Sequence, residues 1–341
     1  MRRSIAIVFA AALVLTGCAN QAPEQDPETI DGSGATPTEE DDASDEAEFP
    51  RTIEIPGGEG VEAQSITLEE APERVAALTY ETGELVAQLG EVDRLVFVQE
   101  SLTKDILSSY PEEMGEVEFH ASNEGAIDPE SVIASDPDLV LLTARRGLEE
   151  ELGQVVEEAG IPLIVLPNQW STVEETTENI EILAQALGVE QAGEELVGEL
   201  EEGLSPREVE GDAPQVLVLS NQAGQPFVTA GQAFPLEMVR LAGAEDAGEE
   251  LDLVRTGPIT AEQVVAIDPD GIVLLDMNGS GDAIFDELLT NEAVADLDAV
   301  KDERMVLMEG RSMQALGFRA TIDGLDELHT WLEQEVVPAT E

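Results

Sequence analysis

Residues 127–142 read IDPESVIASDPDLVLL, and residues 259–274 read ITAEQVVAIDPDGIVL. The two stretches align without a gap, 132 positions apart, and share eight of sixteen residues. Each starts with a good helix N-cap, Asp128 or Thr260, and continues as a short helix that Asp-Pro-Asp stops, because proline cannot continue a helix. The apolar run that follows is typical of a strand buried on both faces. Two copies of one α/β unit predict two similar lobes. The alternative is that α/β proteins commonly reuse this helix–strand arrangement.

The charge of the chain is extreme. Its 341 residues include 75 acids and 15 bases, which gives a net charge of −60 at pH 7. We expect no nucleic acid partner, because such a surface repels phosphate. The acid surplus keeps the chain soluble and fits a medium of high salt or alkaline pH. Apolar residues make up an ordinary 42%, so the chain can form cores for two domains.

The amino terminus has the pattern of a bacterial lipoprotein signal. Arg2 and Arg3 precede an apolar segment over residues 5–15, which is too short to span a bilayer stably. The following Leu-Thr-Gly-Cys resembles a lipobox, which implies cleavage before Cys18 and a diacylglycerol on its sulfur. An ordinary secretory signal with a chance cysteine is the alternative. Acyl chains on Cys18 would anchor the protein to the membrane, and as the only cysteine it excludes an intrachain disulfide.

Composition and periodicity divide the chain into five predicted segments. They are a signal peptide (1–17), a disordered acidic tether (18–50), an N-terminal α/β lobe (51–172), an interlobe helix (173–205) and a C-terminal α/β lobe (206–341). The tether contains eleven acids and no Lys or Arg, so it cannot bury enough apolar surface to fold. Alternating β and α patterns predict two doubly wound lobes with a ligand cleft between them and a long helical spine joining them.

Two further segments carry specific predictions. Residues 51–70 alternate weakly between apolar and polar residues, which predicts a β-hairpin. Residues 173–203 carry apolar residues at helical spacing, which predicts a single rigid helix between the lobes. Gly188 interrupts that pattern, so two helices broken at this glycine are the alternative.

The order of these features resembles the class III solute-binding proteins of bacterial ABC importers, which bind ferric siderophores, haem or cobalamin. The resemblance covers about residues 50–336. The matching stretches are Pro72-Glu73-Arg74-Val75, Glu84-Leu85 to Leu89-Gly90, both repeat copies, Leu241-Ala242-Gly243 and Ala299-Val300-Lys301. No single motif is specific, whereas the ordered set behind a lipobox is.

The resemblance implies a monomeric receptor without catalytic activity or cofactor, lipid-anchored on the extracytoplasmic face of the cell membrane. Its ligand would be an iron complex, a ferric siderophore or haem, and its partner the transmembrane dimer of an ABC permease. Cobalamin or another metal chelate is the alternative ligand. In such receptors one glutamate on each lobe meets an arginine pocket of the permease, and Glu130 and Glu262 fall on those positions. Two carboxylates on pseudo-symmetric lobes suit a two-subunit partner of opposite charge, although a first-turn acid also stabilises its helix dipole.

Ligands of open α/β sheets bind beyond the carboxyl ends of the strands. The candidate ligand contacts at such positions are Tyr80, His120, Arg145, Arg146, Trp170, Asn221, Arg255 and Arg311. Arginine is scarce in this chain, and its planar fork suits carboxylate, hydroxamate or propionate oxygens; pairing with surface acids is the alternative for each.

Two of these candidates have a particular expected role. His120 lies in a predicted loop where, by the resemblance, haem-binding relatives carry a Tyr or His ligand to iron. It is therefore a candidate haem-iron ligand, and a solvent-facing histidine is the alternative. Trp170 is the aromatic expected to pack on a flat or greasy ligand. No direct metal site is otherwise expected.

Two other classes of protein fit the sequence less well. An oxidoreductase-type subunit can share the two-lobed architecture, but the chain has no nucleophile elbow, no P-loop and only two histidines, His120 and His329. A structural or adhesive lipoprotein would need no cleft.

Overall fold

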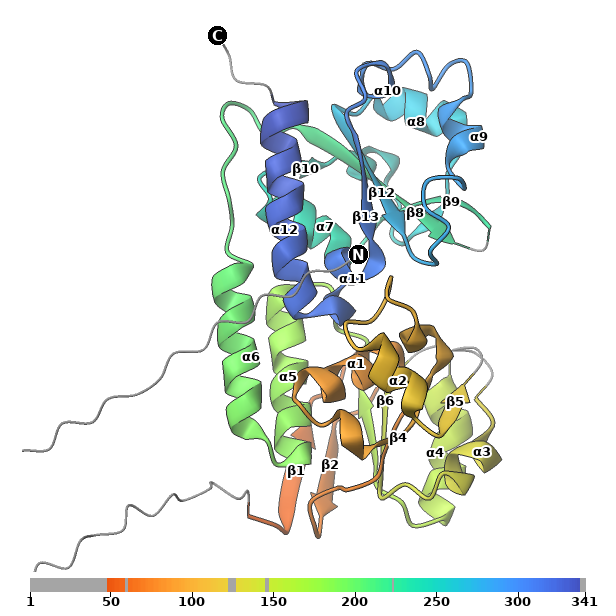
Figure 1. Ribbon diagram of the computed structural model, residues 1–341, viewed down its shortest axis with the longest axis vertical. Helices are drawn as coiled ribbons and strands as arrows, with labels where there is room; N and C mark the ends of the chain where they lie inside the picture. The colour runs from red at the N-terminus through yellow and green to blue at the C-terminus, as the bar shows by residue number, and fades with distance from the viewer. Residues whose placement is uncertain (1–47, 59–60, 122–126, 145–146, 223, 338–341) are drawn as a thin grey trace, which may run out of the picture. The chain divides into compact units, whose positions relative to one another are not determined.

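The computed structural model describes residues 48–337 except 59–60, 122–126, 145–146 and 223 (Figure 1). The chain divides into units 1–44 and 45–341, and every described residue belongs to the second. This unit contains two α/β sheets, each covered by helices, and a helical pair between them in sequence.

The first lobe is built on a five-stranded parallel sheet in the order β5-β4-β3-β6-β7. Its strands are β3 (Val75–Ala77), β4 (Leu95–Gln99), β5 (Phe119–Ala121), β6 (Leu139–Thr143) and β7 (Leu163–Leu166). The chain starts in the middle of this sheet at β3, moves outward to β5, and returns to β6 on the other side of β3. The topological switch point therefore lies between β3 and β6, where open α/β sheets bind ligands.

Helices cover both faces of the first sheet, which explains why every residue of β3 and β6 is buried. They are α1 (Tyr80–Gln88), α2 (Pro111–Glu116), α3 (Pro129–Ala134) and α4 (Leu148–Glu158), with 3₁₀ turns over Val92–Arg94 and Glu100–Thr103. Leu85 of α1 packs in the core on one face, whereas Val132 of α3 and Leu152 of α4 pack in the core on the other.

The predicted hairpin near residue 51 is confirmed. Strands β1 (Arg51–Ile55) and β2 (Gln64–Leu68) pair antiparallel. The Gln64 amide donates a 3.2 Å hydrogen bond to the Val165 carbonyl oxygen of β7, the edge strand of the first sheet. The hairpin is thus attached to that edge.

The prediction of a single helix over residues 173–205 is wrong, and the alternative of two helices is confirmed. Helix α5 (Val173–Leu187) ends at Gly188, and α6 (Glu190–Gly203) follows. Gly188 adopts φ 73°, and the N–H of the next residue, Val189, bonds to the Ala184 carbonyl at 2.9 Å. This left-handed glycine closes α5 and turns the chain back, because a residue with a side chain pays a steric penalty in that conformation. The two helices pack on one another (Figure 1).

The second lobe is built on a six-stranded mixed sheet in the order β11-β9-β8-β12-β13, with β10 also paired to β8. Its strands are β8 (Gln215–Gln222), β9 (Gln225–Val228), β10 (Glu245–Asp246), β11 (Gly257–Pro258), β12 (Gly271–Asp276) and β13 (Met305–Glu309). Strands β8, β12 and β13 run parallel, as the doubly wound pattern predicts. The antiparallel hairpin of β8 with β9 was not predicted.

The helices of the second lobe again occupy both faces of the sheet. They are α7 (Phe234–Leu241), α8 (Ala261–Ile267), α9 (Asp286–Leu289), α10 (Asp298–Lys301), α11 (Gly310–Met313) and α12 (Arg319–Trp331), with 3₁₀ turns over Ala247–Leu251 and Ala315–Gly317 and a final π-helical turn over Leu332–Val336.

The repeated sequence forms the same structure in both lobes. Each copy contributes one short helix, α3 or α8, and the strand that follows it, β6 or β12. The second aspartate of each Asp-Pro-Asp accepts a hydrogen bond from the backbone where the first parallel strand of its own lobe begins. Asp138 accepts from the Arg74 N–H at 2.9 Å, and Asp270 accepts from the Gln215 N–H at 2.8 Å. The repeat therefore joins two strands of the sheet in each lobe.

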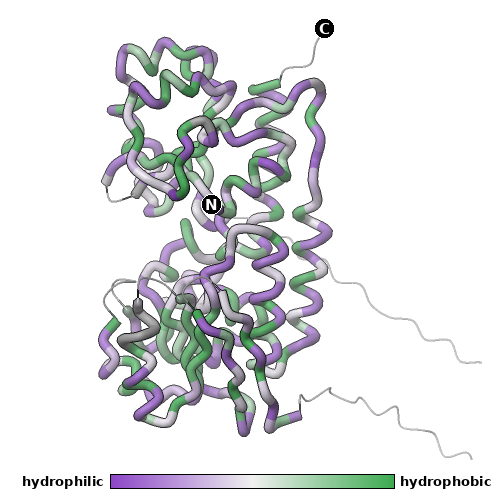
Figure 2. The backbone as a smooth tube through the Cα atoms, turned by 180° about the vertical axis from the view of Figure 1, so that it is seen from behind, coloured by the Kyte–Doolittle hydropathy of each residue, from purple (hydrophilic) through white to green (hydrophobic). Residues whose placement is uncertain are grey.

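One apolar core runs through both lobes on the side of α5 and α6. It includes Leu85 of α1, Leu183 of α5 and Leu325 of α12, all fully buried. Separate cores fill the opposite faces of the two sheets. Figure 2 shows apolar residues concentrated along the central strands of the first lobe and polar residues recurring along the helices. The shared core joins the lobes on the helical side.

Candidate ligand site

The switch point of the first lobe is held together by threonines. Thr79, which precedes α1, accepts a hydrogen bond from the backbone N–H of Thr143 at 3.2 Å, so the ends of β3 and β6 are tied side by side. Tyr80 and Glu81 follow directly in the first turn of α1. Arg145 and Arg146 follow β6 in the sequence and lie outside the described residues, as does Cys18.

A cavity of about 180 Å³ lies between the lobes, beyond these strand ends. From the first lobe it is lined by Tyr80, Glu81, Asn168, Trp170 and Ser171, and from the second by Gln232, Ala233, Phe234, Gln314, Ala315 and Leu316. Two of the predicted ligand contacts, Tyr80 and Trp170, therefore share one cavity. Its wall combines aromatic rings with amide and hydroxyl groups, which is typical of small-molecule sites.

Trp170 connects the cavity to the joint between the lobes. The residue is 7% exposed, and its ring meets the ring of Phe318 edge-on, with 6.3 Å between centroids. Its Nε1 is buried without a hydrogen-bond partner, which costs about 1–3 kcal/mol for such a donor. Phe318, just before α12, holds φ 43°, a conformation that residues other than glycine rarely adopt. Strain of this kind is concentrated at functional sites.

The strand ends of the second lobe form a tight polar turn around Asn221 and Asp276. The Asn221 amide donates to Asp276 Oδ1 at 2.7 Å and accepts from the Met277 N–H at 2.7 Å. Burial alone would raise the pKa of Asp276, but hydrogen bonds from Asn221 and from the backbone N–H groups of Asn278, Gly279 and Gly281 outweigh it and lower that pKa. Asn221 is 2% exposed, so its amide shapes this turn and does not line the cavity.

The remaining described candidates do not line the cavity either. The Arg311 Nε lies 2.9 Å from Glu309 Oε2, so this arginine pairs with a surface acid. Arg255 is exposed on the loop that precedes β11. The expectation that His120 lies in a loop is wrong, because it is part of edge strand β5. Its side chain is exposed, and its Nε2 lies 2.8 Å from the Met114 carbonyl oxygen.

A loop of the first lobe, residues 104–110, makes a direct contact with the second lobe; we term it the bridging loop. The Ile106 carbonyl accepts a 3.0 Å hydrogen bond from the backbone N–H of Arg311. The next side chain, Leu107, packs against Gly310, where a Cβ would lie 2.8 Å from Leu107 Cδ2. The bridging loop therefore touches the start of α11, directly after β13.

A buried carboxylate holds the bridging loop in place. Glu84 of α1 is fully buried and accepts hydrogen bonds from Ser108 Oγ at 2.6 Å, the Ser109 N–H at 2.9 Å and Gln88 Nε2 at 3.3 Å. Burial raises the pKa of Glu84 above its ordinary value of 4.5, although these hydrogen bonds oppose the shift.

The same network continues to the second lobe. Arg319 at the start of α12 donates from Nη1 to the Gln88 carbonyl at 3.0 Å and to Gln88 Oε1 at 3.1 Å, and it also pairs with Glu199 of α6. This network thus connects both lobes and the helical pair; its members are Glu84, Gln88, Arg319 and Glu199. The sequence carried one signal of this network: Glu84 and Gln88 are polar residues one turn apart on a helix flanked by apolar residues.

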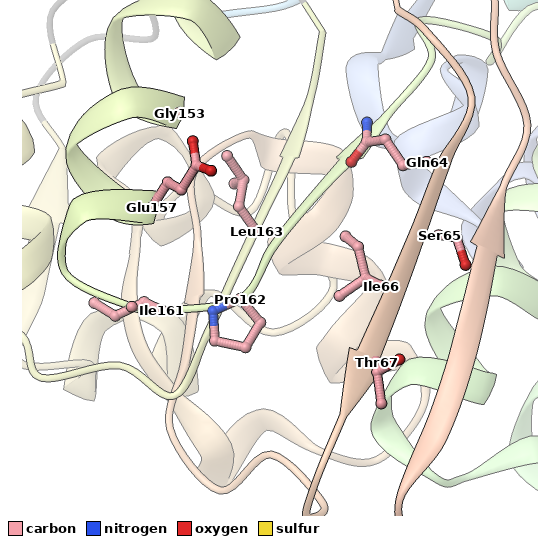
Figure 3. Close-up of a pocket in the computed structure, with 10 residues that line it drawn as sticks. Gln64, Ser65, Ile66, Thr67, Gly153, Glu157, Ile161, Pro162 and Leu163 are labelled. Carbon is pink, nitrogen blue, oxygen red and sulfur yellow. The ribbon is translucent and has the colours of Figure 1, made fainter.

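A second cavity, of about 630 Å³, lies on the first lobe alone (Figure 3). It is lined by β2, the end of α4 and the residues leading into β7, including Ile66, Glu157 and Leu163. It contains none of the predicted ligand contacts. The smaller interlobe cavity is the candidate ligand site, because its walls come from the carboxyl-end side of the parallel strands.

Two further findings concern the described residues. They contain no group of three or more His, Cys, Asp or Glu side chains that could hold a metal ion. Within the same part of the chain, no helix combines the length and the apolarity that crossing a membrane requires.

Two α/β lobes, a helical pair and a cavity at the strand ends define a two-lobed solute-binding protein. Residues 75–311 match the periplasmic binding protein family, and the chain belongs to that family. The family and its relatives bind solutes and are not enzymes, and they indicate no cofactor. The resemblance noted in the sequence is confirmed.

The chain is similar over nearly its whole length to an uncharacterised ABC transporter substrate-binding lipoprotein, YvrC of Bacillus subtilis (strain 168). The two are 24% identical over 332 residues, which cover 95% of this chain and 94% of the relative. The apo periplasmic haem-binding protein RhuT from Roseiflexus sp. RS-1 superimposes with a TM-score of 0.65 at 25% identity, over 76% of this chain and 97% of that one. An ABC-type Fe³⁺-hydroxamate transport protein from Saccharomonospora viridis DSM 43017 shares the fold, with a TM-score of 0.63 at 22% identity, over 84% of this chain and 99% of that one.

Proposed function

We propose that this protein is the substrate-binding lipoprotein of an ABC importer and that it captures an iron complex, a ferric siderophore or haem, for delivery to the permease. The observation that carries the proposal is the interlobe cavity, which brings Tyr80, Trp170 and Phe234 together at the strand ends. Aromatic rings pack well on a macrocycle or a chelate. The similarity to a lipoprotein of ABC transport and to a haem-binding protein supports the same function.

The small volume of the interlobe cavity limits how much of a ligand it can enclose. About 180 Å³ is less than the roughly 300–1,000 Å³ typical of ligand sites. An iron complex would therefore place one edge or arm against Trp170 and extend outward between the lobes. His120 lies away from this cavity, on β5, so haem coordination by His120 requires a ligand that reaches the first-lobe edge.

Ligand titrations test the proposal. The chain has two tryptophans, so a Trp331→Phe variant leaves Trp170 as the only indole reporter. Haemin should shift its Soret band on binding, or a ferric hydroxamate or catecholate should quench Trp170 fluorescence. Either ligand should also raise the melting temperature, because it binds only the folded state. A Soret shift lost in His120→Ala would assign the iron ligand.

The competing ligands and classes have distinct outcomes. Cobalamin in place of both iron complexes would favour the metal-chelate alternative. Absence of any thermal shift or quenching with all of these ligands would refute the receptor function. Turnover of a redox substrate would favour an oxidoreductase-type subunit.

We also propose that Glu130 and Glu262 dock the transmembrane dimer of the permease. Both are exposed in the first turn of a repeat helix, α3 or α8. In Figure 1 these helices lie on the side of the unit away from α5 and α6. Replacing both with alanine should abolish uptake and leave ligand affinity unchanged; unaltered uptake would exclude this role.

The amino terminus completes the proposal. We propose that the signal peptide is cleaved before Cys18 and that Cys18 is lipidated. The tether over residues 18–50 would then hold a monomer on the extracytoplasmic face of the cell membrane. Cys18→Ala should release the protein from the membrane fraction in cells, and retention of the variant would refute lipid anchoring.

A further inference from the structure

We propose that the interlobe cavity receives a positively charged arm of the ligand, an alkylammonium group, and that Glu81 is the residue that selects it. The inference rests on the proposed function and names the class of iron complex that the site would take. Such a ligand is a ferric chelate with a free primary amine on a chain beyond its iron-binding groups.

The wall of the interlobe cavity has one charged side chain among the described residues, and that side chain is acidic. Glu81 is 2% exposed, so its carboxylate acts where an opposite charge is attracted more strongly than in bulk water. No Arg, Lys or His occurs among the described residues that line the cavity. The neutral polar groups of the wall belong to Tyr80, Asn168, Ser171, Gln232 and Gln314.

The position of Glu81 also counters a feature that would otherwise favour an anion. Helix α1 begins at Tyr80, on the cavity wall, and the N-terminus of a helix carries a partial positive charge. Glu81 is the acid in the first turn of α1, so its carboxylate balances that charge. Outside the cavity, Arg311 is paired with Glu309, and the net charge of −60 repels anions from the protein as a whole.

Aromatic rings complete a wall that suits a cation. Tyr80, Trp170 and Phe234 share the cavity, and the face of an aromatic ring attracts a cation within about 6 Å. The segment that carries Trp170 is held to α5, because the Ser171 N–H donates to Glu175 Oε2 at 2.7 Å. This part of the wall is therefore formed before a ligand arrives.

The volume of the cavity fits an arm of a chelate and not the whole chelate. About 180 Å³ holds roughly six water-sized groups, since one water occupies about 30 Å³ of the liquid. An aminoalkyl chain has this size, whereas a macrocycle or a chelated iron is larger. The iron core would lie outside the cavity, and the amine would be the part of the ligand that both lobes enclose.

The test compares two ligands that differ only in the charge of this arm. They are a linear ferric trihydroxamate with a terminal primary amine and its N-acetyl derivative. Affinity is measured by quenching of Trp170 fluorescence in the full-length Trp331→Phe protein. Acetylation should weaken binding about 10- to 150-fold, which is the range for a hydrogen bond to a charged group.

Two variants at neighbouring strand ends identify the residue responsible. Glu81→Gln should weaken binding of the amine by a similar factor and leave binding of the acetylated ligand unchanged, which also shows that this variant is folded. The control is Glu100→Gln, because Glu100 is an exposed acid that follows β4 outside the cavity lining. It should bind both ligands as the native protein does.

Haemin and a ferric tris-catecholate, both anionic, separate failure of the inference from failure of the proposed function. Tighter binding of either one than of the amine would overturn the inference, since a cation such as Arg145, Arg146 or Arg255 would then dominate the site. Equal affinity for the amine and its acetyl derivative, or equal losses in Glu81→Gln and Glu100→Gln, would also overturn it. The proposed function stands in all these cases, because an iron complex is still bound. If the native protein binds none of the four ligands, both fail.

Discussion

Glu84 provides the sharpest test of the structure, because two substitutions at this one position should have opposite consequences. Glu84→Ala removes the acceptor for Ser108 Oγ and for the Ser109 N–H, both in the bridging loop. Ser108 is buried, and a buried donor left without a partner costs about 1–3 kcal/mol, so the variant should lose at least about 1–3 kcal/mol before any cavity is counted. That is a large share of the roughly 5–15 kcal/mol by which a native domain is stable.

Glu84→Gln keeps an acceptor for the Ser109 N–H, and the Ser108 hydroxyl can rotate to accept from the new amide. The substitution also removes a buried carboxyl whose pKa is raised by burial. A raised acid pKa means that the folded state binds more protons than the unfolded state, so the contribution of Glu84 to stability is complete below its ordinary value of 4.5 and is lost as the pH rises through its folded pKa. At neutral pH this variant should therefore match or exceed the native stability.

The assay is urea unfolding of both variants between pH 4 and pH 8, with exposed Glu112→Gln as the matched control. The stability of the native protein minus that of Glu84→Gln should fall as the pH rises above 4.5 and then level off. A flat or rising difference would refute the assignment of Glu84 as a buried acid. A loss in Glu84→Gln as large as that in Glu84→Ala would refute the hydrogen-bond geometry.

Three other substitutions test the joint and the strand ends. Asp276→Asn places an amide donor against the backbone donors of its turn and should lower the free energy of unfolding by about 1–3 kcal/mol at neutral pH. Because the pKa of Asp276 is lowered, this loss should shrink as the pH falls below 3.8. A loss that urea unfolding shows to be independent of pH would contradict this. Gly317→Ala would place its Cβ 1.5 Å from a backbone oxygen of α11, so the variant should show no cooperative thermal melting transition. The control Gly198→Ala, which has open space on α6, should gain about 0.5–1 kcal/mol of stability. Equal effects of the two substitutions would exclude the close approach at Gly317. Arg319→Gln removes the hydrogen bonds from α12 to Gln88 of α1. Amide hydrogen exchange in the bridging loop should become roughly fivefold faster or more, which corresponds to about 1 kcal/mol for the lost hydrogen bonds. Unchanged exchange would exclude coupling between Arg319 and the bridging loop.

The architecture of the two lobes could be predicted from the sequence because of the repeat. The N-caps, the proline stop and the apolar run each act over a few residues, so the helices and strands of both copies follow from local chemistry. The break at Gly188 was also visible as an alternative, but only the left-handed conformation of that residue decides between one helix and two.

The candidate site was harder to predict because its contacts join distant parts of the chain. Asn221 was expected to follow a strand but lies within β8 near its end, and its amide is engaged by Asp276, 55 residues away. Arg311 lies at the expected edge but pairs with Glu309. The link from Arg319 to Gln88 spans 231 residues and has no local signal. Tyr80 and Trp170 were found because each follows a strand, and the carboxyl ends of parallel strands share one edge of the sheet.

The bonds made by the second aspartate of each repeat also bear on how the chain assembles. Asp138 reaches back 64 residues to Arg74, and Asp270 reaches back 55 residues to Gln215, so each tie closes a loop wholly inside its own lobe. Closure over such moderate separations carries a modest entropic cost. During synthesis the first half can therefore reach its native pairing before the second half has emerged, and α12, the last helix made, completes the joint between two halves that are already formed.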